Sequence, residues 1–492
     1  MSLSLRHAPK FARCVAAVMP ALIALGLVTQ STEVRAQTAQ MTAGVGVDGR
    51  PIDLSNIIQN PKSASPLRST AMGLAPTGKA STPQEQQAFD TFVVFRIAEL
   101  TWPPGDSRDT IDRRRQKFKS YEILRGTGLA PDQTLHDRAN QLALLNLPGL
   151  IAKADYPMDA RYNAMLLLGQ LDKVEPDAAQ NKPAVPLEGA QQILLQAART
   201  PTLPEILRIG ALIGIARHCD LQMGSTNRKA FADEALALLK AKTPPQGYSA
   251  NGFHWARKQA LAMVMGLSKT GSETANPDFV QAIAEIIGGD QEPLFLRRDA
   301  ALAFGFLDPA VVAAGGKVKP ADVCKAFVGL TSAVMKAGQP RFDPSAPVDL
   351  SKPEDVFPQP TEDNKTQFAN AVAYYLNCIA VGLGGRDAPQ PRRGLLKALQ
   401  PADPAFQHAT TLLNTHVNAL VTALSKPNPD SNRLLSDLES KRGPFDAWAE
   451  QNQLLAAPAG AAAPAAGTGV AAPAGPAAPV AGTLASPTAP RQ

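Results

Sequence analysis

The chain has 492 residues, of which 45% are hydrophobic, 5% are aromatic and 43 are prolines, and its formal net charge is +6. The hydrophobic content excludes a wholly disordered chain, and the lack of glycine at every third position excludes collagen. Beyond the N-terminal region, no apolar run approaches the ~18 residues of a membrane-spanning helix, which excludes a polytopic membrane protein.

Residues 1–36 have the order of a cleavable signal peptide. A basic stretch without acids precedes an apolar run at 14–28, which is shorter than the ~20 residues of a transmembrane helix. Val34 and Ala36 then supply the small residues that a signal peptidase requires. We expect an exported protein, periplasmic or extracellular, that begins at Gln37 after cleavage; an uncleaved membrane anchor is the alternative.

The same segment carries half of the net charge. Residues 1–36 hold four basic side chains and one acid, a net charge of +3, so the rest of the chain carries the other +3. Such a mild charge over the remaining length argues against nucleic acid as a partner.

Residues 37–84 are rich in Ser, Thr, Pro and Gly and predict a disordered linker. One short apolar patch, Ile52 to Ile58, could dock on the folded body. Helical periodicity begins near Gln86, and residues 85–337 are predicted to form a helical repeat domain.

A basic cluster at 108–119 is the densest charge in the chain. Its interleaved acids predict the solvated face of an amphipathic helix. The alternative is a patch for an anionic polymer or a membrane surface. The basic residues are Arg108, Arg113, Arg114, Arg115, Lys117 and Lys119, and the apolar face holds Ile111, Phe118, Ile123 and Leu124.

Four segments share the form Arg-x-x-Ala-[Leu/Met], with arginines 47, 49 and 41 residues apart, which indicates a repeat of ~40–50 residues. The small alanine predicts close approach of a neighbouring helix. The copies are Arg161 to Met165, Arg208 to Leu212, Arg257 to Leu261 and Arg298 to Leu302, and they follow helices predicted at 132–153, 188–199, 228–242 and 276–289. For the arginines we expect pairing within the helix stack; the alternative is a basic ladder on its inner surface.

This layout of helix pairs, over roughly residues 132–307, resembles the HEAT family of α-helical repeats, which is of the armadillo type. The resemblance implies an all-α fold, a HEAT-like α-solenoid of stacked helix pairs. HEAT-like proteins are generally scaffolds and binding platforms, so the resemblance implies interaction rather than chemistry.

The remaining chain is predicted in three parts. A Pro-rich loop at 338–363 is followed by a C-terminal helical segment at 364–455 and by a disordered Ala/Pro-rich tail at 456–492. The helices predicted from residue 320 onward span 320–337, 365–383, 404–425 and 430–453.

Residues able to carry chemistry are scattered. Beyond the signal segment, Cys219, Cys324 and Cys378 lie in apolar helical contexts, which favours buried free thiols over a disulfide. Neither metal-ligand spacing nor a nucleophile with a positioned base occurs, so no catalytic, cofactor or metal residue is assigned. The histidines beyond the signal segment are His136, His218, His254, His408 and His416, and His218-Cys219-Asp220 is a run of adjacent potential ligands.

The sequence therefore predicts an exported, non-catalytic scaffold or interaction protein without a cofactor, whose partner is another envelope protein. The alternative is an α/α-toroid enzyme, a hydrolase or lyase acting on polysaccharides. Such an enzyme needs an acid and a base in a cleft, usually with aromatic platforms, and the three Trp and six Tyr do not cluster in the sequence.

Overall fold

The computed structural model describes residues 40–102, 110–120, 122–221, 223–224, 226–269, 272–314, 318–337, 365–384, 394, 404–424 and 431–455. The predicted signal peptide, the Pro-rich loop at 338–363 and the tail at 456–492 lie outside these residues. Within them the chain is mostly helical, which confirms the all-α class at this coarse level. No described helix combines the length and the apolar character needed to cross a membrane.

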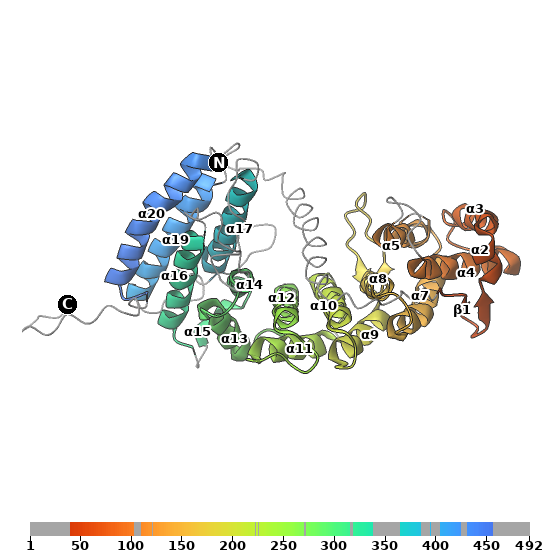
Figure 1. The fold of residues 1–492 in the computed structure, drawn as a ribbon, viewed down its shortest axis with the longest axis horizontal. Coiled ribbons are helices and arrows are strands. Elements are labelled where there is room, and N and C mark those ends of the chain that lie inside the picture. The colour runs from red at the N-terminus through yellow and green to blue at the C-terminus, as the bar shows by residue number, and fades with distance from the viewer. Residues whose placement is uncertain are drawn as a thin grey trace, which may run out of the picture.

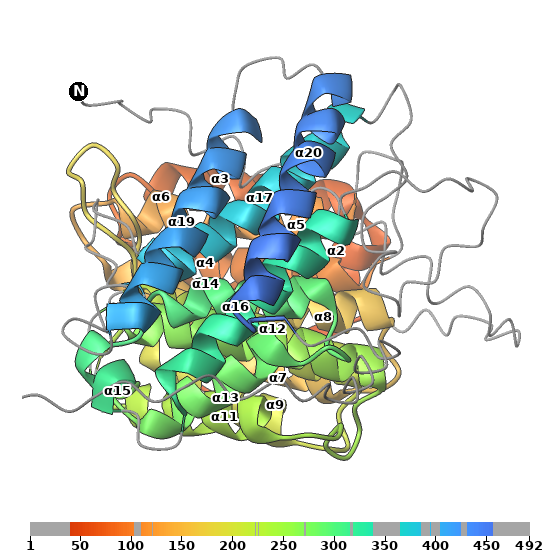
Figure 2. The same ribbon diagram turned by 90° about the vertical axis from the view of Figure 1, so that its left-hand side faces the viewer.

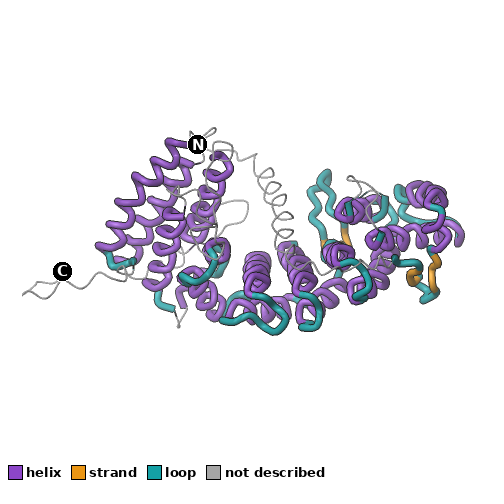
Figure 3. Tube along the Cα trace, viewed as in Figure 1, coloured by secondary structure: helices purple, strands orange, loops and turns teal. Residues whose placement is uncertain are grey.

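The elements follow one another along the chain as helices interrupted by two short hairpins (Figure 3). The N-terminal part comprises β1 (Ala43–Val45), β2 (Pro51–Asp53), α2 (Ser55–Gln59), η1 (Pro61–Ser63), α3 (Ala64–Leu74), α4 (Pro83–Ala98), η2 (Glu99–Thr101), α5 (Ile111–Lys119) and α6 (Leu124–Gly128). The central part comprises α7 (Thr134–Ala152), α8 (Met158–Leu168), β3 (Asp172–Val174), β4 (Val185–Pro186), α9 (Glu188–Arg199), α10 (Glu205–Asp220), α11 (Arg228–Lys240), α12 (Ala250–Leu267), α13 (Pro277–Gly288) and α14 (Leu294–Phe304). The C-terminal part comprises α15 (Pro309–Ala314), α16 (Pro320–Ala337), α17 (Lys365–Gly384), α19 (Pro404–Leu424) and α20 (Ser431–Gln451).

The prediction of a disordered linker at 37–84 is wrong for residues 40–84. This segment forms β1, β2, α2 and α3, and α3 packs against α4. The expected docking of the apolar patch is confirmed, since Leu54 and Ile57 are buried. Long-range hydrogen bonds hold the hairpin: the Asn146 side chain accepts from the amide of Val45 and donates to its carbonyl, at 2.8 and 3.0 Å.

The central helices form pairs, and the pairs stack. Helices α7 with α8, α9 with α10, α11 with α12, and α13 with α14 pack within pairs. The second members contact one another in succession, α8 with α10, α10 with α12, and α12 with α14. Figure 1 shows a curved double row, with α9, α11 and α13 along one side and α8, α10, α12 and α14 along the other.

Local sequence explains the helix ends. At α13, Asn276 is the N-cap, its side chain accepts from the Asp278 amide at 2.9 Å, and Pro277 follows at the first helical position, as predicted. Helices α8, α10 and α14 each follow a proline at the N-cap position, where a fixed φ favours the turn into the helix. These prolines are Pro157, Pro204 and Pro293.

The C-terminal helices α16, α17, α19 and α20 pack side by side and stand at one end of the row (Figures 1 and 2). They join the row where α17 packs on α14 and α16 packs on α13. The close approach of α17 needs glycine: a Cβ on Gly382 would lie 2.2 Å from the backbone oxygen of Ala301.

The four repeat alanines, Ala164, Ala211, Ala260 and Ala301, are fully buried. We expect Ala211→Phe and Ala260→Phe each to lower the free energy of unfolding by about 1–3 kcal/mol, because extra volume in a packed contact forces its neighbours apart. Thermal melts measure the effect, with the exposed Ala237→Phe on α11 as the matched control. Equal melting temperatures for the buried and control variants would contradict the close packing.

Candidate functional site

Three buried arginines make one recurring contact. Arg161, Arg208 and Arg297 each donate from Nε to the carbonyl ten residues earlier, at the end of the preceding helix, at 2.8, 3.1 and 2.8 Å. Each stands four residues after the N-cap proline of its helix. The sequence alignment is therefore wrong by one residue in its fourth copy, where Arg297 rather than Arg298 makes the shared contact.

The other two aligned arginines form ion pairs. Arg257 contacts both carboxylate oxygens of Glu292 at 2.6 and 2.7 Å, and Arg298 pairs with Asp299 at 2.6 Å. All four aligned arginines are thus buried and partnered by a carboxylate or a helix-end carbonyl, which is the expected packing role rather than an exposed ladder.

In the basic cluster at 108–119, Arg114, Arg115 and Lys119 make structural contacts, whereas Arg113 is exposed. Arg114 is buried and donates to the carbonyls of Glu99 and Trp102 at 2.6 and 2.8 Å. Lys119 reaches the β3–β4 hairpin, and Arg115 pairs with Asp112. Of the predicted apolar face, Phe118, Ile123 and Leu124 are fully buried.

The β3–β4 hairpin inserts a buried carboxylate between two cations. Asp172 is 1% exposed; it receives two hydrogen bonds from Arg217, at 2.9 and 2.7 Å, and lies 3.2 Å from Lys119 Nζ. Lys119 also contacts the buried Glu175 at 3.0 Å. No local sequence pattern predicts this network, because its partners come from α5 and α10.

Two of the scattered histidines lie against the same network. His136 is fully buried, with Nε2 2.9 Å from the Asp172 carbonyl and Nδ1 3.2 Å from the Leu124 carbonyl. His218 donates from Nε2 to the Gly169 carbonyl at 3.1 Å, and its Nδ1 has no hydrogen-bond partner among the described residues. Burial, followed by the charge of Arg217, lowers the pKa of His218 to about 4, so this ring is neutral at pH 7.

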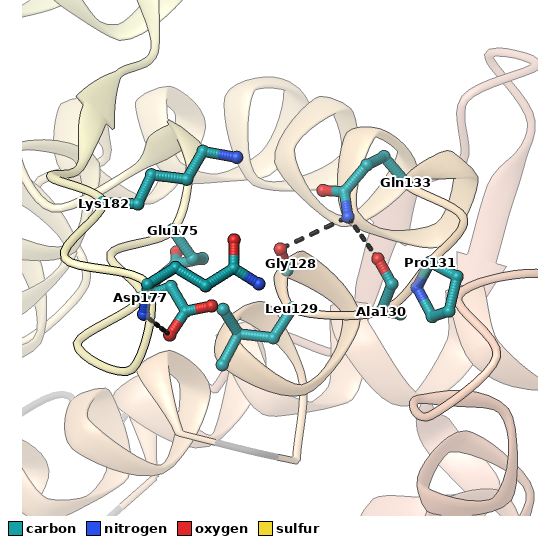
Figure 4. A pocket seen from close by; sticks show the side chains of 9 residues that line it. Gly128, Leu129, Ala130, Pro131, Gln133, Glu175, Asp177 and Lys182 are labelled. Atoms are coloured by element: carbon teal, nitrogen blue, oxygen red, sulfur yellow. Dashed lines mark hydrogen bonds between the residues drawn. The ribbon is translucent and has the colours of Figure 1, made fainter.

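A cavity of about 270 Å³ opens beside the network, between the α6–α7 turn and the hairpin (Figure 4). Its lining is apolar along the turn and charged or polar along the hairpin. The turn contributes Gly128, Leu129, Ala130, Pro131 and Gln133, and the hairpin contributes Glu175, Asp177, Gln180 and Lys182.

A second cluster, the corner cluster, lies where α14 packs against both α12 and α17. It consists of Trp255, Lys258, Phe295, Arg298, Asp299, Tyr374 and Tyr375. Trp255 stacks on Phe295 with ring centroids 5.6 Å apart. The Arg298 guanidinium lies 4.9 and 4.4 Å from the ring centres of Tyr374 and Tyr375.

The side chains of the corner cluster differ in charge and in their exposure to solvent. Lys258 lies 4.7 Å from the Trp255 ring centre and 3.8 Å from Asp299, and burial lowers its pKa against the opposing pull of Asp299. Tyr374 is 39% exposed, and Trp255 and Phe295 are half-buried. The chain therefore gathers aromatic and cationic side chains that are far apart in the sequence.

The other candidates do not converge. Cys219, Cys324 and Cys378 are buried free thiols, as preferred from the sequence. His254 lies 3.8 Å from Glu292, and His416 packs against Phe445 and Trp448, whereas the His408 side chain lies outside the described residues. In the described parts of the chain, no three His, Cys, Asp or Glu side chains gather around a possible metal position.

Comparisons of this chain with models of protein families, with curated proteins and with solved structures found no match. The resemblance to HEAT repeats thus remains a prediction from the sequence.

Proposed function

We propose that this chain is an exported, non-catalytic interaction protein built as a HEAT-like α-solenoid. The observation that carries the proposal is the succession of contacts α8–α10–α12–α14, in which each helix pair packs on the next. Repeats that contact their neighbours in this way generate an extended surface suited to a protein partner. The N-terminal helices and the C-terminal helices lie at opposite ends of the row, which supports an open array over a closed ring (Figure 1).

The corner cluster is the contact region that we propose for this partner. Tryptophan, tyrosine and arginine are the residues most enriched among binding hot spots, since they combine apolar area with a polar group. Trp255 and Tyr374 offer partly exposed rings, and Lys258 adds a cation beside Trp255. Another envelope protein, rather than nucleic acid, fits the predicted export and the mild net charge.

The experiment is affinity capture from a cell-envelope extract with the purified chain, followed by identification of what is retained. We expect one partner to be retained by the wild type and by the control Leu145→Ala, whose side chain is exposed on α7. Trp255→Ala and Tyr374→Ala should each weaken retention by about tenfold or more, as hot-spot truncations do. Equal retention by all variants would contradict the corner cluster as the contact.

One observation supports the α/α-toroid enzyme: the buried Asp299 lies 3.8 Å from Lys258, in a cluster that also holds four aromatic rings. Incubation with acidic and neutral polysaccharides separates the two functions. We expect no turnover. Turnover that disappears in Asp299→Asn while the melting curve stays intact would replace the scaffold proposal by the enzyme.

A further inference from the structure

We propose that the cavity between the α6–α7 turn and the β3–β4 hairpin binds a free α-amino acid with an apolar side chain. This small-molecule site is separate from the corner cluster and does not depend on the protein partner proposed above. Its lining supplies a cation, acceptors and an apolar strip, the three features that such a zwitterion requires.

The cation is Lys182. Its backbone exchanges two hydrogen bonds with Asp177, at 2.9 and 2.8 Å, so the two side chains leave the hairpin on the same face. The Asp177 carboxylate is nevertheless turned to the loop, where Oδ1 accepts from the amides of Ala179 and Gln180 at 2.9 and 3.3 Å. Within the described residues the Lys182 ammonium has no ion-pair partner, and it is free to hold a ligand carboxylate (Figure 4).

Acceptors for a ligand ammonium lie across the cavity. The Gln133 side-chain nitrogen donates to the carbonyls of Gly128 and Ala130, at 3.3 and 2.7 Å, which leaves its side-chain oxygen directed toward the cavity (Figure 4). The second oxygen of Asp177 is the other acceptor. Glu175 also faces the cavity, but Lys119 already contacts it.

Size and apolar lining restrict the ligand further. Sites for drug-sized molecules usually measure about 300–1,000 Å³, so a cavity of about 270 Å³ suits a molecule nearer the size of an amino acid. Leu129, which is 37% exposed, and Pro131 lie along the turn, where they offer an apolar surface to the ligand side chain.

The cavity walls are held in place before any ligand binds. A Cβ on Gly128 would lie 2.4 Å from Glu175 Cγ, so the turn and the hairpin are in close contact there. The hairpin is fixed from behind by Lys119 and Arg217, and by His136, which lies 2.9 Å from the Asp172 carbonyl. Preformed walls lower the ordering cost of binding, which favours measurable affinity for a small ligand.

Isothermal titration calorimetry of the full mature chain with L-leucine tests the proposal. Two matched probes are 4-methylpentanoate, which lacks the ammonium, and 3-methylbutylamine, which lacks the carboxylate. We expect L-leucine to bind with a Kd of about 1 mM and each probe to bind about tenfold more weakly, because each loses one charged contact. No binding of L-leucine at concentrations up to about 50 mM would overturn the proposal.

Substitutions test whether Lys182 makes the contact with the ligand carboxylate. Lys182→Met should weaken the binding of L-leucine by about tenfold. It should leave the affinity for 3-methylbutylamine unchanged, since this amine has no carboxylate for Lys182 to bind. Lys173→Met is the matched control, as Lys173 is exposed on β3 outside the cavity lining, and its affinity should equal that of the wild type. An unchanged affinity in Lys182→Met, or an equal loss in both variants, would also overturn the proposal.

Discussion

Replacing Asp172 by alanine is expected to lower the free energy of unfolding by about 2–4 kcal/mol. Asp172 is almost fully buried and is the carboxylate that Arg217 and Lys119 share. Its removal leaves Arg217 without its carboxylate and leaves Lys119 with Glu175 alone. The expected cost stays below that of a fully buried pair, since the side chains of Arg217 and Lys119 are 30% and 20% exposed and reach water.

Urea unfolding followed by circular dichroism measures this change. The control is Asp155→Ala, because Asp155 is 61% exposed and its contact with Lys153 spans 4.0 Å, so it should change stability by less than about 0.5 kcal/mol. If both alanine variants unfold at the same urea concentration, the hairpin network does not stabilise the fold.

Lowering the pH from 7 to 4 is expected to destabilise the wild type more than His218→Gln, by about 3 kcal/mol. In the unfolded chain the ring titrates near 6.5, whereas in the fold its pKa is about 4 because of burial and the nearby Arg217. Above pH 6.5 both states are neutral and His218 adds no pH dependence. Between 6.5 and 4 only the unfolded state takes up the proton, so stability falls as the pH falls.

Glutamine is the informative replacement, because its amide can still donate to the Gly169 carbonyl that His218 contacts at 3.1 Å. Unfolding free energies of the wild type and the variant are measured at intervals from pH 7 to pH 4. The informative quantity is the difference between the two unfolding free energies at each pH, because the carboxylates titrate in both proteins. Parallel curves over this window would mean that His218 takes up its proton in the folded state.

The helix pairs are predictable from the sequence where local signals agree. Helix α9 matches its predicted range, and α7, α11 and α13 agree within two residues at each end, because prolines, glycines and caps interrupt the apolar period. The N-terminal hairpin was missed for the opposite reason. Its order depends on Asn146, a hundred residues away, and a polar Ser/Pro-rich segment carries no local sign of that contact.

The shift from Arg298 to Arg297 has a physical origin in the repeat itself. Both arginines have an alanine at the third following position, Ala300 for Arg297 and Ala301 for Arg298, and both alanines are fully buried. The Arg-x-x-Ala part of the motif therefore fits either residue, whereas the following Leu302 completes it only for Arg298. The proline four residues earlier, which precedes Arg161, Arg208 and Arg297 alike, was the signal that separates them.

Local sequence patterns do not predict the candidate sites. Trp255, Phe295 and Tyr374 span about 120 positions, and only the packing of α14 on both α12 and α17 gathers them in one cluster. The cavity joins a turn and a hairpin that no periodic pattern marks. The composition shows that aromatic residues are few, but it does not predict that several of them lie in the corner cluster.

The contact of Arg161, Arg208 and Arg297 with the carbonyl ten residues earlier has a kinetic consequence. Loops of about ten residues close in roughly 10–100 ns, far faster than contacts between distant segments form. Each of these helix pairs can therefore close as soon as its own two helices exist, before its neighbours take shape. Stacking of pairs then follows closure within each pair, and the row can assemble from several starting points along the chain.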